Sequence, residues 1–235
     1  MTIAQNIAAI REKINAAAIA AGRDPKDISL CAATKMNNAD AVQQAIAGGI
    51  DCCGENRVQE LTQKLSENAY VGAPVHFIGH LQTNKVKQVV GKVDLIQSVD
   101  SEHLAAAINT YAGKIGIIQD ILLEVNIANE ESKSGFSLQA LYAFLEKAAD
   151  FSSISIRGLM AIPPITQNST DNHKFFQEMY NLSVDIMAKK YDNVRVDILS
   201  MGMSDDYTDA IACGSTMVRI GTAIFGARDY VSSHP

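Results

Sequence analysis

The chain has no tryptophan, and its 7 tyrosines and 7 phenylalanines make up only 6% of its residues. These rings are not interleaved with basic residues, as a surface that stacks nucleic-acid bases requires. Basic residues are also few: 20 lysines and arginines stand against 26 acidic residues and give a net charge of −6, which argues against a general nucleic-acid binder. No stretch approaches the roughly 20 consecutive apolar residues of a membrane-spanning helix. We therefore expect neither nucleic acid nor a membrane as a partner.

Cysteines are few as well, and they follow neither a disulfide framework nor the ligand spacing of a zinc site: Cys31, Cys52, Cys53 and Cys213. Cys52 and Cys53 are adjacent, so on a strand their side chains leave opposite faces. The first 21 residues have isoleucines at helical spacing interrupted by charges, unlike a signal peptide. We expect buried, reduced thiols, no metal site and a cytoplasmic protein.

Short apolar runs alternate with helical patterns along the whole chain. The strand-like runs are Ile28–Thr34, Ile50–Cys53, Val75–Ile78, Asp94–Ser98, Ile121–Ile127, Ile154–Met160, Val194–Leu199 and Met217–Ile220. The helical patterns are Ile3–Ala21, Ala39–Ala47, Arg57–Glu67, Asn84–Val90, Glu102–Ala112, Leu138–Ala149, His173–Lys190 and Asp205–Cys213.

Strand–helix alternation of this kind predicts right-handed βαβ units and a parallel sheet. About eight strands close naturally into a barrel, and 235 residues suit a single α/β domain over residues 1–235 of the (β/α)8 or TIM-barrel type. The last strand lacks a long following helix, and the helix Ile3–Ala21 could cover that gap. A doubly wound open sheet is the alternative that alternation alone leaves open.

Two of the apolar runs end abruptly in small polar residues. Val194–Leu199 opens into Ser200–Ser204, and Met217–Ile220 opens into Gly221-Thr222. Glycines and hydroxyls at such strand ends expose backbone N–H groups where the next helix begins, which suits a phosphate dianion. The loops after the last two strands of a (β/α)8 barrel often hold one. With Arg219 between the two elements, the sequence predicts a site for a phosphorylated small molecule.

Lys35 is the candidate for a reactive amine. It follows the first apolar run, so its ammonium would lie inside the mouth of a barrel. Burial and a nearby cation such as Arg219 would lower its pKa and make the amine available as a nucleophile. A lysine that extends to solvent, or one paired with Glu55, is the simpler interpretation. A lysine opposite a phosphate site is, however, what pyridoxal phosphate (PLP) requires.

Nine blocks spread over nearly the whole chain resemble the pyridoxal phosphate homeostasis protein family. They are Ala33–Lys35, Gly54–Glu60, His76–Lys85, Ser98–Ser101, Val125–Asn126, Ser132–Gly135, Arg157–Pro163, Leu199–Asp206 and Val218–Thr222. Taken together these blocks are very specific, although no single one is. Val75 and Cys53 stand where the family often has aromatic residues.

The resemblance implies a barrel of the alanine racemase type, PLP fold type III, with pyridoxal 5'-phosphate as the cofactor. Lys35 matches the lysine that holds PLP as a Schiff base, the internal aldimine. Arg219 matches the arginine facing the pyridine nitrogen. Ser200, Gly221 and Thr222 match the phosphate cradle. Asn56 could contact the rim of the cofactor or cap the helix that follows it.

Three functions remain open. Arginine is always protonated, so a pyridine nitrogen facing Arg219 stays unprotonated and the ring is a weak electron sink. The tyrosine opposite the lysine in racemases of this barrel comes from a second domain, for which the chain past Gly226 leaves no room, and no tyrosine ends a predicted strand. We therefore expect no catalytic residue and a PLP-binding protein of vitamin B6 homeostasis that stores, buffers or delivers the cofactor to apo PLP-dependent enzymes. The alternatives are a single-domain amino-acid racemase that uses His80 or water, and a barrel enzyme for a sugar phosphate.

Three lesser features complete the expectations. His80 could be an acid or base, or a hydrogen-bonded residue at the mouth. Ser132–Gly135 could cover the mouth, receive a second ligand or form a surface loop. No apolar interface patch is obvious, so we expect a monomer.

Overall fold

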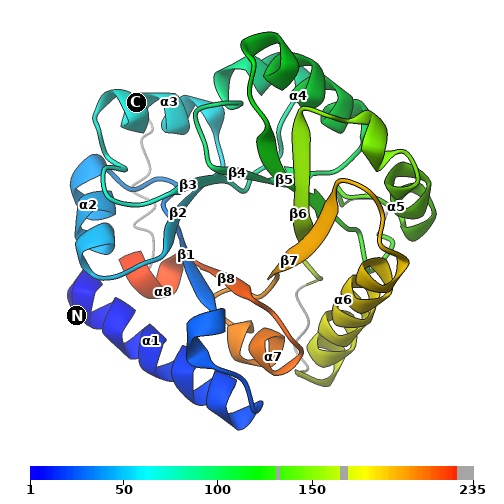
Figure 1. Cartoon of the computed structure of the whole chain (residues 1–235). Helices are drawn as coiled ribbons and strands as arrows, with labels where there is room; N and C mark the ends of the chain where they lie inside the picture. The colour runs from blue at the N-terminus through cyan, green and yellow to red at the C-terminus, as the bar shows by residue number, and fades with distance from the viewer. Residues whose placement is uncertain (131–132, 165–168, 227–235) are drawn as a thin grey trace.

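The computed structural model describes residues 1–130, 133–164 and 169–226. Eight parallel strands form a closed barrel in sequence order, and helices surround it (Figure 1). The strands are β1 (Ser29–Ala33), β2 (Cys52–Glu55), β3 (Val75–Phe77), β4 (Leu95–Val99), β5 (Gln119–Glu124), β6 (Ile154–Met160), β7 (Val194–Ser200) and β8 (Met217–Ile220). The α-helices are α1 (Ile3–Ala20), α2 (Ala39–Ala47), α3 (Val58–Ser66), α4 (Glu102–Ile115), α5 (Leu138–Leu145), α6 (Ser169–Lys189), α7 (Tyr207–Ala212) and α8 (Thr222–Phe225). Three 3₁₀ turns are η1 (Pro25–Asp27), η2 (Thr83–Gln88) and η3 (Ala148–Asp150).

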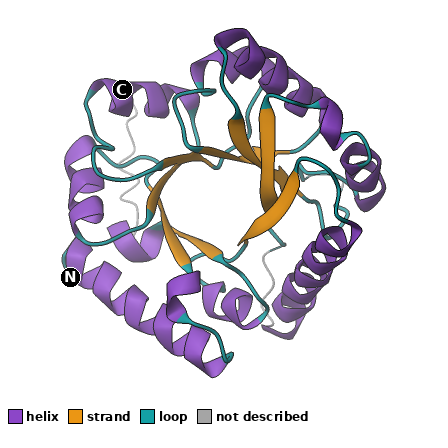
Figure 2. Cartoon of the chain, in the orientation of Figure 1, coloured by secondary structure: helices purple, strands orange, loops and turns teal. Residues whose placement is uncertain are grey.

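β2, β3, β4 and β8 are buried along their whole length because both of their faces are covered, whereas β7 is buried only at Leu199 and Ser200. A large cluster of buried side chains fills the layer between the strands and the surrounding helices, the two layers that Figure 2 separates by colour. Two small clusters, centred on Cys31 and on Leu122, belong to the barrel interior. This double burial explains the apolar runs without polar alternation.

Closure of the barrel joins the two ends of the chain. β1 pairs with β8 in parallel register, with Cys31 opposite Arg219. α1 packs against α7 and α8 and covers the gap beside the last strand, where the Asn6 side-chain amide donates to the Ile224 carbonyl at 2.8 Å. The prediction of a (β/α)8 barrel with a covering N-terminal helix is confirmed, and the open-sheet alternative is wrong.

Several predicted boundaries are wrong. The second strand begins at Cys52 rather than Ile50, because the Ile50 N–H still donates to the Ala45 carbonyl of α2 at 3.5 Å. This strand continues to Glu55, whose buried carboxylate forms an ion pair with Lys64. The predicted helix Asn84–Val90 is the 3₁₀ turn η2, a form used in such short pieces. The predicted helix Leu138–Ala149 ends at Leu145, and η3 follows it.

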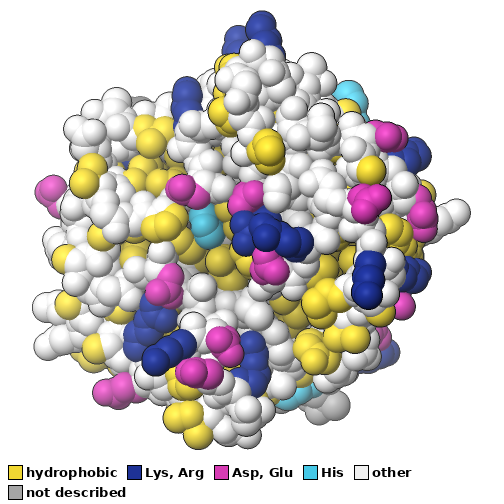
Figure 3. All heavy atoms as spheres, viewed as in Figure 1, with side chains coloured by type: hydrophobic (Ala, Val, Ile, Leu, Met, Phe, Trp, Pro, Cys, Tyr) yellow, Lys and Arg dark blue, Asp and Glu magenta, His cyan; other side chains and the backbone are white. Residues whose placement is uncertain are grey.

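Charges of both signs lie together over the centre of the face drawn in Figure 3. Arg157 on β6 is paired with Asp120 on β5 at 2.6 Å and with Asp197 on β7 at 3.0 Å, which ties three neighbouring strands together. No helix within the described residues combines the length and the apolar character that crossing a membrane requires.

Candidate functional site

The six residues predicted for the cofactor site meet at the carboxyl ends of the strands. Lys35 follows β1, and Asn56 follows β2. Ser200 ends β7, Arg219 lies on β8, and Gly221 and Thr222 follow β8. Because β1 pairs with both β2 and β8, these segments are neighbours: a Cβ on Gly221 would lie 3.4 Å from the Cβ of Ala33. The structure therefore brings the predicted residues to one mouth, while their individual roles stay predictions.

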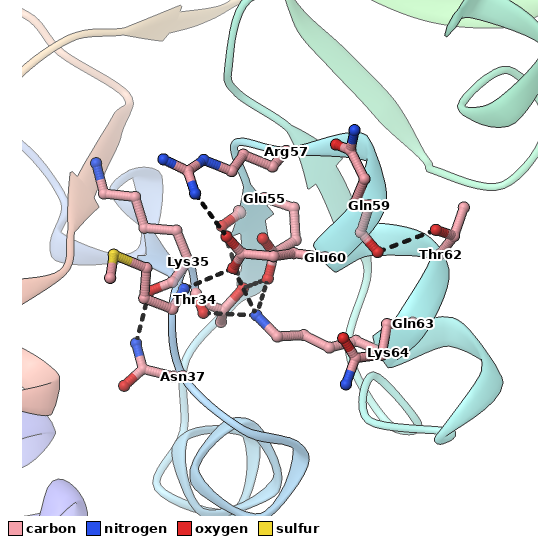
Figure 4. Close-up of polar contacts among 12 residues, drawn as sticks. Thr34, Lys35, Asn37, Glu55, Arg57, Gln59, Glu60, Thr62, Gln63 and Lys64 are labelled. Atoms are coloured by element: carbon pink, nitrogen blue, oxygen red, sulfur yellow. Dashed lines mark hydrogen bonds and ion pairs between the residues drawn. The ribbon is translucent and has the colours of Figure 1, made fainter. Parts of the chain in front are cut away.

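A buried lysine fixes the backbone on one side of Lys35. The Lys64 ammonium donates to the carbonyl oxygen of Thr34 at 2.7 Å and to Glu55 Oε1 at 2.5 Å. The Thr34 hydroxyl donates to the same carboxylate oxygen at 2.6 Å. Figure 4 shows the Lys64 ammonium among these groups, with the Lys35 side chain extending away from them. Sequence reasoning missed Lys64, because a lysine inside an amphipathic helix reads as exposed, whereas it is only 4% exposed.

The other side of Lys35 is held by the same helix. The Met36 backbone N–H donates to Glu60 Oε2 at 2.6 Å, and Glu60 also lies 3.6 Å from the Lys64 ammonium. Met36 has a positive φ of 62°, which is uncommon for a residue other than glycine. Glu55 was one of the partners considered for Lys35 in the sequence. Its Oε1 accepts hydrogen bonds from the Lys64 ammonium and the Thr34 hydroxyl. The peptide groups before and after Lys35 are thus both anchored to α3.

Arg219 is a buried cation inside the mouth, 5% exposed. Its Nη1 donates to the Ser200 carbonyl at 2.9 Å and to the Ser200 hydroxyl at 2.6 Å, and its Nη2 donates to the Ala161 carbonyl at 2.9 Å. Burial lowers the pKa of Arg219, while the nearby groups Cys31, Glu124 and Asp206 act to raise it. An arginine remains protonated under such conditions, so the site keeps one fixed positive charge.

The Ser200 side chain is engaged inside the barrel. It is fully buried, and its hydroxyl donates to Gln97 Oε1 at 2.7 Å while accepting from Arg219. The Gln97 amide nitrogen in turn lies 2.9 Å from His76 Nδ1. A polar chain therefore leads from Arg219 into the barrel, and the predicted role of Ser200 in a phosphate cradle stays a prediction.

A hydroxyl of the loop after β7 and one at the start of α8 meet at the mouth. The Thr222 hydroxyl donates to the Ser204 hydroxyl at 3.2 Å, and Thr222 is exposed. The loop that carries Ser204 needs glycine at position 202, where φ is 94° and a Cβ would lie 2.6 Å from Ala210. The Gly202 carbonyl accepts from the Arg219 backbone N–H at 3.0 Å. Ser204 was not among the predicted site residues, although it lies in the polar segment that predicted the phosphate site.

A cavity of about 280 Å³ opens beside these groups, lined among others by Asn56, Gly79, His80, Glu124 and Asn126. Asn56 Oδ1 is buried and has no hydrogen-bond partner among the described residues. The cap predicted for Asn56 is wrong: α3 begins at Val58 with Arg57 at the N-cap position and no side-chain cap. Burial, with a smaller effect of Asp100, raises the pKa of Glu124, and the positive charges of Arg219 and His80 oppose the rise.

His80 Nδ1 lies 3.2 Å from Asp100 Oδ2, and the histidine side chain is 61% exposed. His80 therefore lies at the mouth beside a carboxylate, and its role as an acid or base or as a hydrogen-bonded residue stays a prediction. Ser132 lies outside the described residues, whereas Lys133 and Ser134 line the same cavity as His80.

Comparison with known proteins gives a consistent result. The family model described as the alanine racemase N-terminal domain matches residues 3–229. A pyridoxal phosphate homeostasis protein of Aquifex aeolicus is 39% identical over 230 residues, which cover 98% of this chain and 100% of the relative. One of Escherichia coli strain K12 is 40% identical over 231 residues, or 97% of each chain.

Solved structures agree with this similarity. PipY of Synechococcus elongatus with PLP bound has a TM-score of 0.84 and 31% identity over 96% of this chain and 100% of its own. An alanine racemase of Clostridium difficile has a TM-score of 0.70 at 15% identity and covers 96% of this chain but only 57% of its own, which shows a shared fold alone.

Proposed function

Because the chain belongs to the pyridoxal phosphate homeostasis proteins, within the family of the alanine racemase N-terminal domain, we propose that it binds pyridoxal 5'-phosphate and stores, buffers or delivers it without robust catalysis. The observation that carries this proposal is the meeting of an amine, a buried cation and exposed hydroxyls at one mouth: Lys35, Arg219, and the pair Ser204 and Thr222.

The residues present fit this cofactor. Asn56 Oδ1 is a buried acceptor without a partner in the described part of the chain, as expected of a group that meets a ligand. The bonds of Arg219 engage three of the five N–H groups of a guanidinium, and none of these bonds is with a carboxylate among the described residues. A positive charge paired only with neutral oxygens suits a polar or anionic ligand.

Each residue has a distinct part in this proposal. The Lys35 amine holds the cofactor covalently, and Arg219 faces the pyridine nitrogen. Ser200, Gly221 and Thr222 hold the phosphate, and Asn56 contacts the rim. When bound, PLP supplies an aldehyde carbon for a lysine amine and a ring that acts as an electron sink.

The chain's own groups limit that chemistry. Arg219 keeps its proton, so it donates a hydrogen bond to the ring nitrogen rather than protonating it. No tyrosine ends a strand among the described residues, and the His80 side chain beside Asp100 is largely exposed to solvent. Binding is thereby favoured over turnover.

The proposal also includes exchange of the cofactor, the compartment of the protein and its oligomeric state. Thr222 is exposed and Lys35 is partly exposed, which supports exchange of the cofactor with apo PLP-dependent enzymes. The four cysteines are unpaired thiols, which supports a reducing compartment such as the cytoplasm. The exposed large apolar side chains are spread over different elements, among them Ile19, Val71, Ile118 and Met187, which supports a monomer.

One experiment tests carrier against enzyme. The PLP-loaded chain is mixed with an apo-aminotransferase, and recovery of aminotransferase activity is followed beside racemisation of L-alanine by the loaded chain alone. We expect recovery of the acceptor enzyme and racemisation near background. A turnover number in the usual enzymatic range of about 1–10³ s⁻¹ would overturn the carrier proposal.

A further inference from the structure

A second group of reactive side chains lies inside the barrel, outside the proposed cofactor site. Cys31 on β1, Cys52 on β2 and His76 on β3 each offer one donor atom, and these atoms lie within 4.8 Å of one another. The three residues are 0%, 3% and 8% exposed, respectively. The spacing of the cysteines in the sequence predicted no metal site, because the three residues come together only when the strands pair.

Strand register explains the grouping. Cys31 and Cys52 are directly opposite each other in the β1–β2 pair, so their side chains share the interior face. They pack with Ile78 and Met217 in one interior cluster. The neighbouring Cys53 belongs to the outer core instead, as adjacent strand residues must.

A glycine keeps the space around the sulfur open. Gly54 follows on β2 and is opposite His76 in the β2–β3 pair. A Cβ at this position would lie 2.8 Å from Cys31 Sγ and 2.7 Å from Ile78 Cδ1. Any larger residue would push the sulfur aside, so glycine preserves the room in which the thiols and the imidazole face one another.

Two thiolates and one imidazole are a donor set for thiophilic metal ions. Zinc binds sulfur at about 2.3 Å and histidine nitrogen at about 2.0–2.1 Å, so two ligands of one ion lie roughly 3.5–4 Å apart. The three donor atoms lie within 4.8 Å of one another, so small side-chain rotations would bring them to that separation. Soft sulfur donors select zinc and monovalent copper over magnesium or calcium, which require oxygen ligands.

We propose that Cys31, Cys52 and His76 bind one thiophilic d¹⁰ metal ion, zinc(II) or copper(I), inside the barrel.

The groups of the cluster also influence one another electrostatically. The hydrogen bond from Cys52, followed by the contact with His76 and the charge of Arg219, lowers the pKa of the Cys31 thiol against the opposing effect of burial. The same bond, together with burial, raises the pKa of Cys52. Cysteine binds such an ion as the thiolate, so the protons that the two thiols carry are released as the ion binds.

The site is separate from the mouth but connected to it. Cys52 is the first residue of β2, and His76 is the second residue of β3, whereas Lys35 follows the end of β1. His76 Nδ1 contacts Gln97, which bonds to Ser200, which bonds to Arg219.

The test uses the full-length chain without PLP, so that its failure and a failure of the cofactor proposal are distinguishable. Metal-free protein is titrated with Co(II), a spectroscopic substitute for zinc, and separately with buffered Cu(I). We expect one ion per chain by elemental analysis and a sulfur-to-cobalt charge-transfer band. Both should be lost in Cys52→Ser and kept in Cys53→Ser, the matched control one residue away on the other face.

A second measurement keeps the proposal falsifiable if Cys52→Ser does not fold. X-ray absorption of the loaded wild-type chain should show two sulfur ligands and one nitrogen ligand. Less than about 0.1 ion per chain, a signal retained by folded Cys52→Ser, or a first shell without sulfur would each overturn the proposal. A wild-type chain that forms a Cys31–Cys52 disulfide in place of binding the ion would also overturn it.

Discussion

The ammonium of Lys64 on α3 lies 2.7 Å from the carbonyl oxygen of Thr34, the residue before Lys35. The same ammonium neutralises Glu55, a carboxylate with no exposure. The charged side chain of Lys64 therefore holds the end of β1, directly before the proposed PLP lysine Lys35. This contact links the stability of the fold to the position of Lys35.

The first prediction concerns this buried pair. Lys64→Met keeps the length of the side chain but leaves the Glu55 carboxylate buried without its cation. Breaking a buried ion pair by removing one partner costs about 3–5 kcal/mol, and we expect a loss of this size in the free energy of unfolding, measured with urea. Lys87→Met, at an exposed lysine, is the control and should change it by no more than about 0.5 kcal/mol.

A double variant separates loss of charge balance from loss of packing. Adding Glu55→Gln to Lys64→Met removes the unpaired charge and should restore much of the stability. If Lys64→Met alone is as stable as the wild type, the buried pair does not hold this strand end.

The second prediction concerns the phosphate. Thr222→Val keeps the shape of the side chain and removes a hydroxyl that the proposed cradle uses. We expect PLP to bind roughly tenfold more weakly, the equivalent of about 1.5 kcal/mol for one charge-assisted hydrogen bond. Pyridoxal, which lacks the phosphate, should bind the variant and the wild type equally.

Thr110→Val, at an exposed threonine of α4, is the matched control and should bind PLP as the wild type does. Equal losses for pyridoxal and PLP in Thr222→Val would remove Thr222 from the phosphate cradle.

The third prediction concerns the pH dependence of stability. The pKa of Glu124 is raised mainly by burial and secondarily by Asp100. A carboxyl with a raised folded-state pKa stabilises the fold fully below its unfolded pKa, and this contribution is lost as the pH rises through the folded value. Glu124→Gln cannot ionise, so its stability relative to the wild type should increase as the pH rises from about 4 towards 7.

Urea unfolding at several pH values measures this difference. Glu12→Gln, at an exposed carboxylate of α1, should follow the wild-type curve. If the stability of Glu124→Gln changes with pH in parallel with that of the wild type, ionisation of Glu124 does not destabilise the fold.

Most of the fold was predictable because its signals are local. The apolar runs of buried parallel strands and the helical patterns between them are visible in short windows, and all eight strands lie at or near their predicted places. The boundaries that differ depend on other parts of the chain. Glu55 belongs to β2 because its buried carboxylate forms an ion pair with Lys64 of α3. No pattern in the sequence around Glu55 indicates this ion pair.

The sequence predicted which residues lie at the site, but it did not predict the contacts between their side chains. Sequence placed Lys35, Arg219 and Thr222 at strand ends, and the fold brings those ends together. It could not show that Lys64 is buried, that the Ser200 hydroxyl points to Gln97, or that Cys31, Cys52 and His76 meet. Each of these relations depends on strand register and on side chains from separate elements, which spacing along the chain does not encode.

The fourth prediction tests the central claim that this mouth holds PLP on Lys35. The chain is loaded with PLP, reduced with borohydride and digested, and the modified peptides are identified by mass spectrometry. Lys85→Ala serves as the control variant, because it changes another lysine of the chain and should leave the labelling intact. We predict one pyridoxyl group per chain on Lys35 and none at this position in Lys35→Ala. A pyridoxyl group found only on another lysine, or no stable label at all, would contradict the account.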